Sequence, residues 1–124
     1  MEFQKDNSFF LGRLKSLKYA LNGAIKLITT EHSIMVQFSL AIVLQFAGFY
    51  FKISHTEWLF QTLAIGLVLS IEGLNTAVEK VADFIHPNFN NRIGFIKDIA
   101  AGAVFFAAIT AIIIGTIIYM PRFI

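Results

Sequence analysis

Two stretches without a charged residue constrain this chain more than any other feature of its sequence. Residues 34–51 and 99–121 contain no Asp, Glu, Lys or Arg, and each is close to the roughly 20 apolar residues that a helix needs to cross a bilayer. The chain is 56% hydrophobic and has 14 Phe among its 124 residues, which is too apolar for a soluble domain of this length. We therefore predict an integral membrane protein.

A third span is expected between these two stretches. Residues 58–71 are uncharged, and helical periodicity continues to Ile85, with Pro87 as a stop signal. The predicted fold is an all-α membrane protein with three transmembrane helices and an N-terminal amphipathic interfacial helix, in one domain over residues 1–124. The predicted surface helix covers about 8–30, and the predicted spans cover about 34–51, 57–85 and 97–120.

The N-terminal segment is amphipathic. Its apolar residues recur three and four apart, which is the helical period, at Phe10, Leu14, Leu17, Leu21, Ala24 and Ile28. The opposite side carries Lys15, Lys18, Asn22 and Lys26. The apolar face can sink into the headgroup boundary of a membrane, and packing against the chain's own spans is an equally good interpretation.

Lys and Arg are concentrated on one side of the predicted membrane. Five precede the first span and three flank the second loop, whereas the first loop and the C-terminal end have one each: Lys5, Arg13, Lys15, Lys18 and Lys26; Lys80, Arg92 and Lys97; Lys52; Arg122. The positive-inside rule then predicts a multi-pass protein of the inner (plasma) membrane with its N-terminus and second loop in the cytoplasm. A net charge of +2 gives no broad basic surface for nucleic acid.

Polar residues recur along one side of the middle span. Glu72, Asn75, Glu79 and Asp83, called the polar stripe below, are three or four residues apart, and at 100° per residue they fall within about 80° of one another. Glu72 would lie about 21 Å from Trp58, inside a hydrocarbon layer of about 30 Å, and Glu79 near its inner boundary. An ionisable residue in a span costs on the order of 3 kcal/mol, so several of them indicate a function.

The chemistry of the stripe favours a divalent cation. Oxygen ligands suit Mg²⁺, which commonly takes one or two carboxylates together with phosphate oxygens. Glu31 directly precedes the first span, and Lys97 and Asp98 directly precede the third, so the predicted topology brings them to the same boundary as Glu79. The chain contains no G-x-x-x-x-G-K-[ST], G-x-G-x-x-G, H-E-x-x-H or G-x-S-x-G motif. Its lack of cysteine removes thiol catalysis.

Three interpretations of the stripe remain from the residues alone. It can serve a phosphoryl-transfer site, it can form a cation or proton pathway through an oligomer, or it can hold helices together through hydrogen bonds in a structural subunit. A pathway would have few polar groups in the outer half of the middle span, where only Gln61, Thr62 and Ser70 are polar.

Two segments resemble the signature of a known family. E-G-L-N-T-A-V-E-K-V-A-D at residues 72–83 and K-D-I-A-A-G-A-V at residues 97–104 are similar to the bacterial integral-membrane diacylglycerol kinases, which include undecaprenol kinases. The resemblance runs from residues 17–23 through the third span. It implies an ATP-dependent lipid kinase that uses Mg²⁺, phosphorylates undecaprenol or diacylglycerol, and forms a homotrimer with active sites shared between neighbours.

The resemblance also implies roles for single residues. Glu72 matches the proposed general base for the lipid hydroxyl, and Glu31 and Glu79 match the carboxylates that hold the metal on ATP. The matches on the nucleotide side are Asn75 and Lys97 at the phosphates, Asp98, and Lys15, Tyr19 and Gly23 on the amphipathic helix. Asp83 matches a family acid whose role can be structural.

Two positions depart from the family pattern. The family's N-terminal arginine aligns with Gly12, next to Arg13, and Gln37 stands where the better-known diacylglycerol kinases have a second acid. Together with K-D-I-A-A-G-A-V and the Glu57-Trp58 pair, Gln37 makes the chain more similar to the undecaprenol kinase branch. Undecaprenol is therefore slightly favoured as the expected substrate.

Overall fold

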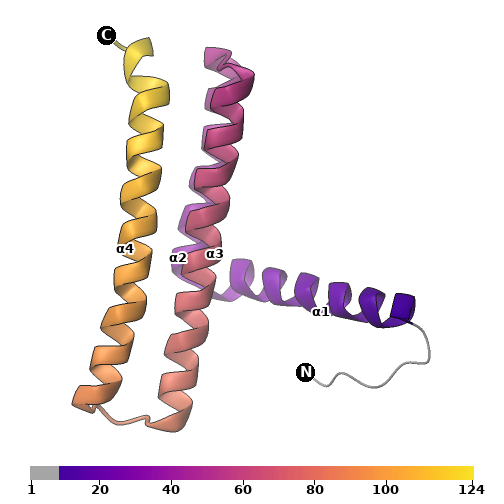
Figure 1. The fold of residues 1–124 in the computed structure, drawn as a ribbon, viewed down its shortest axis with the longest axis vertical. Helices are drawn as coiled ribbons and strands as arrows, with labels where there is room; N and C mark the ends of the chain where they lie inside the picture. Colours follow the sequence, from indigo (N-terminus) through magenta and orange to yellow (C-terminus); the bar gives the residue numbers. More distant parts are fainter. Residues whose placement is uncertain (1–8) are drawn as a thin grey trace.

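The computed structural model describes residues 9–124 as a helical protein. Its elements are α1 (Phe9–Thr30), α2 (His32–Phe51), α3 (His55–Ile85), α4 (Asn91–Tyr119) and a short 3₁₀ turn, η1 (Met120–Arg122). Helices α2, α3 and α4 run side by side in alternating directions, and α1 projects sideways from the start of α2 (Figure 1). Three segments are long and apolar enough to cross a membrane, namely His32–Phe51, His55–Ile85 and Asn91–Arg122. The predicted three-span, all-α fold is confirmed.

The helix ends differ slightly from the prediction. Ser8, the predicted start of the surface helix, lies outside the described residues, as does Lys5. Helix α3 begins at His55 because Ser54 and Glu57 form a capping box, in which each side chain accepts a hydrogen bond from the other residue's backbone N–H. Helix α4 begins at Asn91, before the predicted residue 97, because the Asn90 side chain caps it by accepting from the Arg92 N–H at 2.8 Å. The helix therefore extends beyond its apolar stretch.

A break at Glu31 separates α1 from α2. Glu31 has an extended backbone, with φ −105° and ψ 116°, so the chain turns there. No residue of α1 is buried, and large hydrophobic side chains such as Phe10, Leu14 and Leu17 are exposed along it. This arrangement favours the interfacial interpretation of α1 over packing against the spans, because its apolar face is left free for a membrane surface.

The bundle packs through small residues and turns its large ones outward. Ala41, Ala64 and Ala107 are among the few buried hydrophobic residues, whereas many Phe, Leu and Ile side chains are exposed. Close helix packing through small residues is typical of membrane helices, where lipid covers the large apolar side chains. Helices α3 and α4 extend beyond the level at which α1 joins α2 (Figure 1), so the charged third of α3 lies past that junction.

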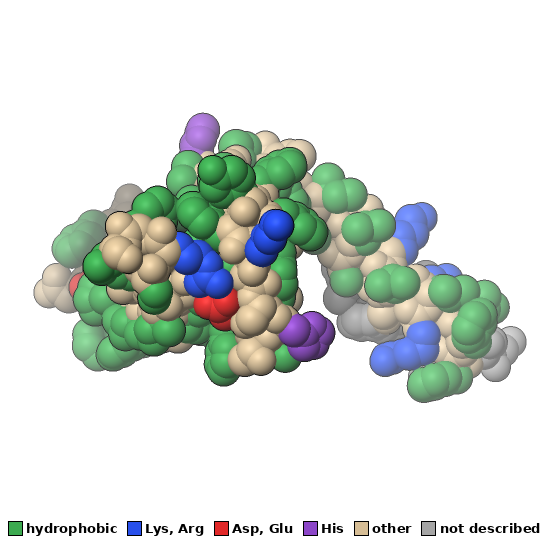
Figure 2. Space-filling model, turned by 90° about the horizontal axis from the view of Figure 1, so that it is seen from above, with side chains coloured by type: hydrophobic (Ala, Val, Ile, Leu, Met, Phe, Trp, Pro, Cys, Tyr) green, Lys and Arg blue, Asp and Glu red, His purple; other side chains and the backbone are tan. Residues whose placement is uncertain are grey.

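Polar side chains connect all three spans at the end of the bundle remote from the stripe. Buried Gln61 donates from Nε2 to the Leu44 carbonyl and to Gln45 Oε1, both at 3.1 Å, and it accepts from the Tyr119 hydroxyl. Arg122 holds the Glu57 carboxylate through two contacts of 2.8 and 3.1 Å. Figure 2 looks onto this end, where acidic and basic side chains meet among hydrophobic ones. We call these residues the remote cluster.

Candidate active site

The polar stripe lies on one uninterrupted helix. Helix α3 runs without a break from His55 to Ile85, so Glu72, Asn75, Glu79 and Asp83 keep the spacing that places them on one side. Asn75 Nδ2 donates to Glu79 Oε1 at 2.8 Å, which fixes these two side chains against each other one helical turn apart. Glu79 is exposed, Asn75 is half-buried and Glu72 is buried. Exposure therefore rises along the stripe from Glu72 to Glu79.

Two atoms of the stripe are buried without a hydrogen-bond partner among residues 9–124. They are Glu72 Oε2 and Asn75 Oδ1, and only 7% of the Glu72 surface is exposed. A buried acceptor without a donor is costly, and native structures retain such groups mainly where they have a use. Both atoms are acceptors, so this part of the stripe can receive a donor or a cation.

Glu31 faces the same stretch of α3. Its Oε1 lies 3.1 Å from Lys80 Nζ, and Lys80 directly follows Glu79 in the chain. The break between α1 and α2 thus puts Glu31 beside the exposed end of the stripe, as the predicted topology required. The sequence alone does not reveal the Lys80–Glu31 contact, because the two residues lie in different segments of the chain and no periodicity relates them.

Lys97 reaches the stripe from α4. Its Nζ lies 2.6 Å from Asp83 Oδ1, which joins the start of α4 to the end of α3. Asp98, the next residue, is exposed. Lys97 therefore reaches the polar stripe, as expected from the topology. Its partner there is Asp83, the stripe residue whose counterpart in the family can have a structural role.

The three candidate residues on α1 lie apart from this group within one chain. Lys15, Tyr19 and Gly23 share one side of α1 through their spacing of four, and a Cβ added at Gly23 would meet nothing within 4 Å. Helix α1 touches α3 near its own end, where Leu27 Cδ1 would lie 3.1 Å from a Cβ at Gly73. The contacts within one chain therefore join Glu31 to α3 through Lys80, Asn75 to Glu79, and Lys97 to Asp83. The three α1 residues lie to one side of these contacts.

The carboxylates suit a magnesium ion that arrives with phosphates. Within the described part of the chain, three or more His, Cys, Asp or Glu residues do not gather into a metal-binding group. Mg²⁺ bound with a nucleotide commonly uses only one or two carboxylates, since phosphate oxygens and water complete its shell. Glu31 and Glu79 are the two carboxylates that would hold such an ion, and the buried acceptors of Glu72 and Asn75 lie next along the stripe.

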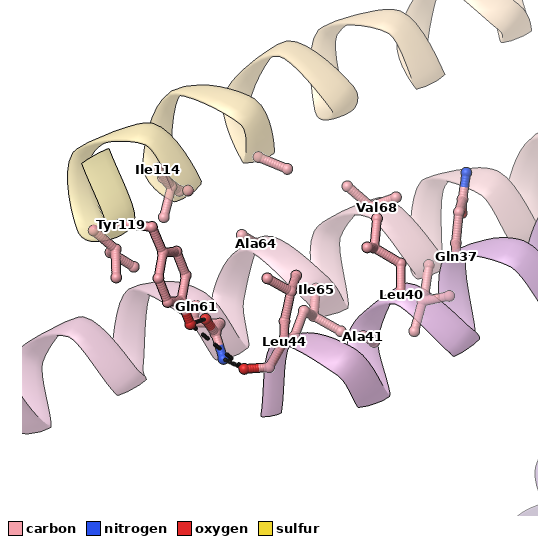
Figure 3. A pocket seen from close by; sticks show the side chains of 14 residues that line it. Gln37, Leu40, Ala41, Leu44, Gln61, Ala64, Ile65, Val68, Ile114 and Tyr119 are labelled. Carbon is pink, nitrogen blue, oxygen red and sulfur yellow. Dashed lines mark hydrogen bonds between the residues drawn. The ribbon is translucent and has the colours of Figure 1, made fainter. Parts of the chain in front are cut away.

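An apolar groove approaches the stripe from the membrane side. It is bounded by α2, α3 and α4, and Figure 3 shows Gln61 and Tyr119 at one end and Gln37 at the other. Between them the lining is aliphatic, including Leu40, Leu44, Ile65, Val68 and Leu69. Leu69 is three residues before Glu72, which corresponds to a rise of about 4.5 Å along the axis of α3, so the groove runs along α3 toward the stripe.

Comparison with known proteins decides the family. The model of prokaryotic diacylglycerol kinase matches residues 18–119 of the chain. The chain belongs to the prokaryotic diacylglycerol kinase family. It is 34% identical over 116 residues to the undecaprenol kinase of Bacillus subtilis, covering 94% of this chain and 91% of that protein. It is 29% identical over 109 residues to the diacylglycerol kinase of Synechocystis, covering 87% of this chain and 62% of that protein.

Membership of this kinase family confirms the resemblance seen in the sequence and the prediction of an enzyme of the lipid kinase type. The conducting-pathway alternative gains no support from the structure. In the described half of the bundle remote from the stripe, Gln61 is held by Gln45 and Tyr119, and the groove beside it is lined mainly by aliphatic side chains.

Proposed function

We propose that this protein transfers the γ-phosphoryl group of MgATP to the hydroxyl group of a membrane lipid alcohol. The observation that carries this proposal is Glu72, a buried carboxylate on a membrane-spanning helix whose Oε2 lacks a partner in the described structure. A carboxylate at this depth suits a substrate whose hydroxyl is itself in the membrane. The same helix side leads to Glu79 at the exposed end, where a water-soluble nucleotide can arrive.

Glu72 acts as the general base in this proposal. The lipid hydroxyl gives its proton to the Glu72 carboxylate while its oxygen forms a bond to the γ-phosphorus. The bond between that phosphorus and the bridging oxygen breaks, and ADP leaves. Phosphoryl transfer requires mainly alignment of the two substrates and stabilisation of charge, and the polar stripe can provide both.

Glu31 and Glu79 would hold the metal on ATP, and Asn75 and Lys97 would contact the phosphates. Mg²⁺ would neutralise negative charge on the transferring phosphoryl group. Lys97 leaves Asp83 to do so, which is easily achieved because both side chains are partly exposed, at 37% and 59%, and such ion pairs contribute little. Asp98, Lys15, Tyr19 and Gly23 would complete the nucleotide side.

The α1 residues support a shared site. Lys15, Tyr19 and Gly23 lie on a helix that projects from the bundle (Figure 1), so they can reach a nucleotide held between neighbouring chains. We infer a homotrimer of single-domain subunits, residues 1–124, in the inner (plasma) membrane. The N-terminus and the loop between α3 and α4 would face the cytoplasm, where ATP is available.

Undecaprenol is the slightly favoured substrate and diacylglycerol the alternative. The undecaprenol kinase relative has the higher identity and covers more of the chain than the diacylglycerol kinase relative. The test is an assay of lipid phosphate formed from MgATP by the purified protein in mixed micelles with each alcohol. Higher kcat/KM with undecaprenol would support this choice, and higher kcat/KM with diacylglycerol would reverse it. If neither alcohol is phosphorylated, the kinase proposal is rejected.

A further inference from the structure

Lys80, like Lys97, pairs with a carboxylate of the candidate site. Its Nζ lies 3.1 Å from Glu31 Oε1, and Lys97 Nζ lies 2.6 Å from Asp83 Oδ1. At 100° per residue, Lys80 is about 100° around α3 from Glu79 and about 60° from Asp83, which puts it at the edge of the polar stripe. Lysines from α3 and α4 therefore both hold acidic groups where a nucleotide would bind.

The two carboxylates proposed to hold the metal have different neighbours. Glu79 Oε1 accepts from the neutral amide of Asn75 at 2.8 Å, a contact that can orient a metal ligand without adding charge. Glu31 Oε1 is paired instead with the ammonium group of Lys80. An ammonium group and a divalent cation on one carboxylate repel each other, so Lys80 competes with a metal for Glu31.

The Lys80–Glu31 pair can separate at little cost. The Lys80 side chain is 70% exposed and that of Glu31 is 25% exposed, and ion pairs so open to water are weak. The ammonium group of a lysine sits on a long flexible stem and can move between partners. Since Mg²⁺ arrives with phosphate oxygens in its shell, a nucleotide phosphate is an anion to which Lys80 can move.

We propose that Lys80 is a counter-ion that rests on Glu31 and moves to the nucleotide phosphates when MgATP binds. This inference rests on the proposed kinase function and adds a binding residue to it. In the free protein, Lys80 neutralises Glu31 and weakens its binding of metal ions that carry no nucleotide. When MgATP binds, Glu31 holds the metal and Lys80 neutralises phosphate charge, as Lys97 does. The site therefore selects the metal–nucleotide complex over the metal alone.

The test is Lys80→Met, which removes the charge and keeps an apolar stem. Electron paramagnetic resonance measures the Kd for Mn²⁺ alone, on purified protein in detergent without lipid alcohol. Calorimetry on the same sample measures the Kd for the magnesium complex of the non-hydrolysable imido analogue of ATP. The Kd for Mn²⁺ should fall about twofold to fivefold, because a weak competing ion pair is lost. The Kd for the nucleotide complex should rise at least about twofold, because the lost charge-assisted phosphate contact outweighs that gain.

Two further variants serve as controls. Lys80→Arg keeps the positive charge and should leave both Kd values close to those of wild type. Lys18→Met removes a lysine from the exposed polar side of α1 and should also leave both unchanged. These variants separate the position of the Lys80 charge from the general loss of a positive charge at this membrane surface.

Opposite shifts of the two Kd values in Lys80→Met would support the proposal. If either Kd fails to shift in its expected direction, the proposal is overturned. A rise in both values together with a lower thermal midpoint would show that the Lys80–Glu31 pair only holds the start of α2 against α3. Because neither titration contains the lipid alcohol, an absence of phosphoryl transfer would be detected separately, in the lipid phosphate assay on wild type.

Discussion

Lys97 and Asp83 meet at 2.6 Å, although we assign only the lysine to the phosphates of ATP. The carboxylate can hold the lysine side chain near the stripe until the nucleotide, with its greater negative charge, replaces it. Asp83 is then a resting partner with a minor effect on turnover. The two members of one ion pair should therefore respond differently to substitution.

We predict that Lys97→Met raises the KM for MgATP at least tenfold, because a charge-assisted contact contributes about 1.5–3 kcal/mol. Asp83→Asn should change the KM for MgATP by less than about fivefold, since exposed ion pairs contribute at most about 1 kcal/mol. Steady-state kinetics with varied MgATP measures both. Equal effects of the two substitutions would show that the KM for MgATP depends on the Lys97–Asp83 ion pair and not on a contact between Lys97 and phosphate.

At the scale of the helices, Gly48 and Trp58 set the distance between α2 and α3 near their shared turn. A Cβ at Gly48 would lie 2.5 Å from Trp58 Cη2 and 2.7 Å from Trp58 Cζ2. The indole ring also lies against Phe49, with ring centroids 4.9 Å apart. Glycine is therefore needed here for close approach of the ring to the α2 backbone.

Gly48→Ala should destabilise the protein by about 1–3 kcal/mol, the usual cost of overpacking. Gly66→Ala is the control, because a Cβ there meets nothing within 4 Å and alanine is favoured in helices by about 1 kcal/mol. Thermal unfolding in detergent should show a lower midpoint for the first and an equal or higher one for the second. The same midpoint in both variants would contradict the packing of Trp58 on Gly48.

The sequence predicts the elements better than it predicts their contacts. The three spans follow from hydrophobic length, and the common face of Glu72, Asn75 and Glu79 follows from helical spacing. The Lys80–Glu31 and Arg122–Glu57 pairs join residues far apart in the chain, so helical periodicity cannot reveal them. The sequence also gives no sign that Gln37 Oε1 is buried without a partner in the described structure, because this depends on what α3 and α4 place around that side chain.

The orientation of the whole molecule can be tested directly, because the chain contains no cysteine. A single cysteine at His55 or at Asn88, both exposed, marks opposite ends of α3. In intact cells, a membrane-impermeant maleimide should label His55→Cys, and it should label Asn88→Cys only after the membrane is permeabilised. The reverse pattern would put the stripe's exposed end outside the cell, away from ATP.

The proposed phosphoryl transfer depends most on Glu72 acting as the base at a membrane-embedded site. The decisive measurement is transfer of radiolabelled γ-phosphate from MgATP to the lipid alcohol by wild type, Glu72→Gln and Glu57→Gln. Glu57 gives a matched control at the other end of α3. We predict that Glu72→Gln lowers kcat by a factor of about 10² to 10⁴, with the oligomer intact, and that Glu57→Gln keeps its activity. Wild-type turnover in Glu72→Gln would contradict the account.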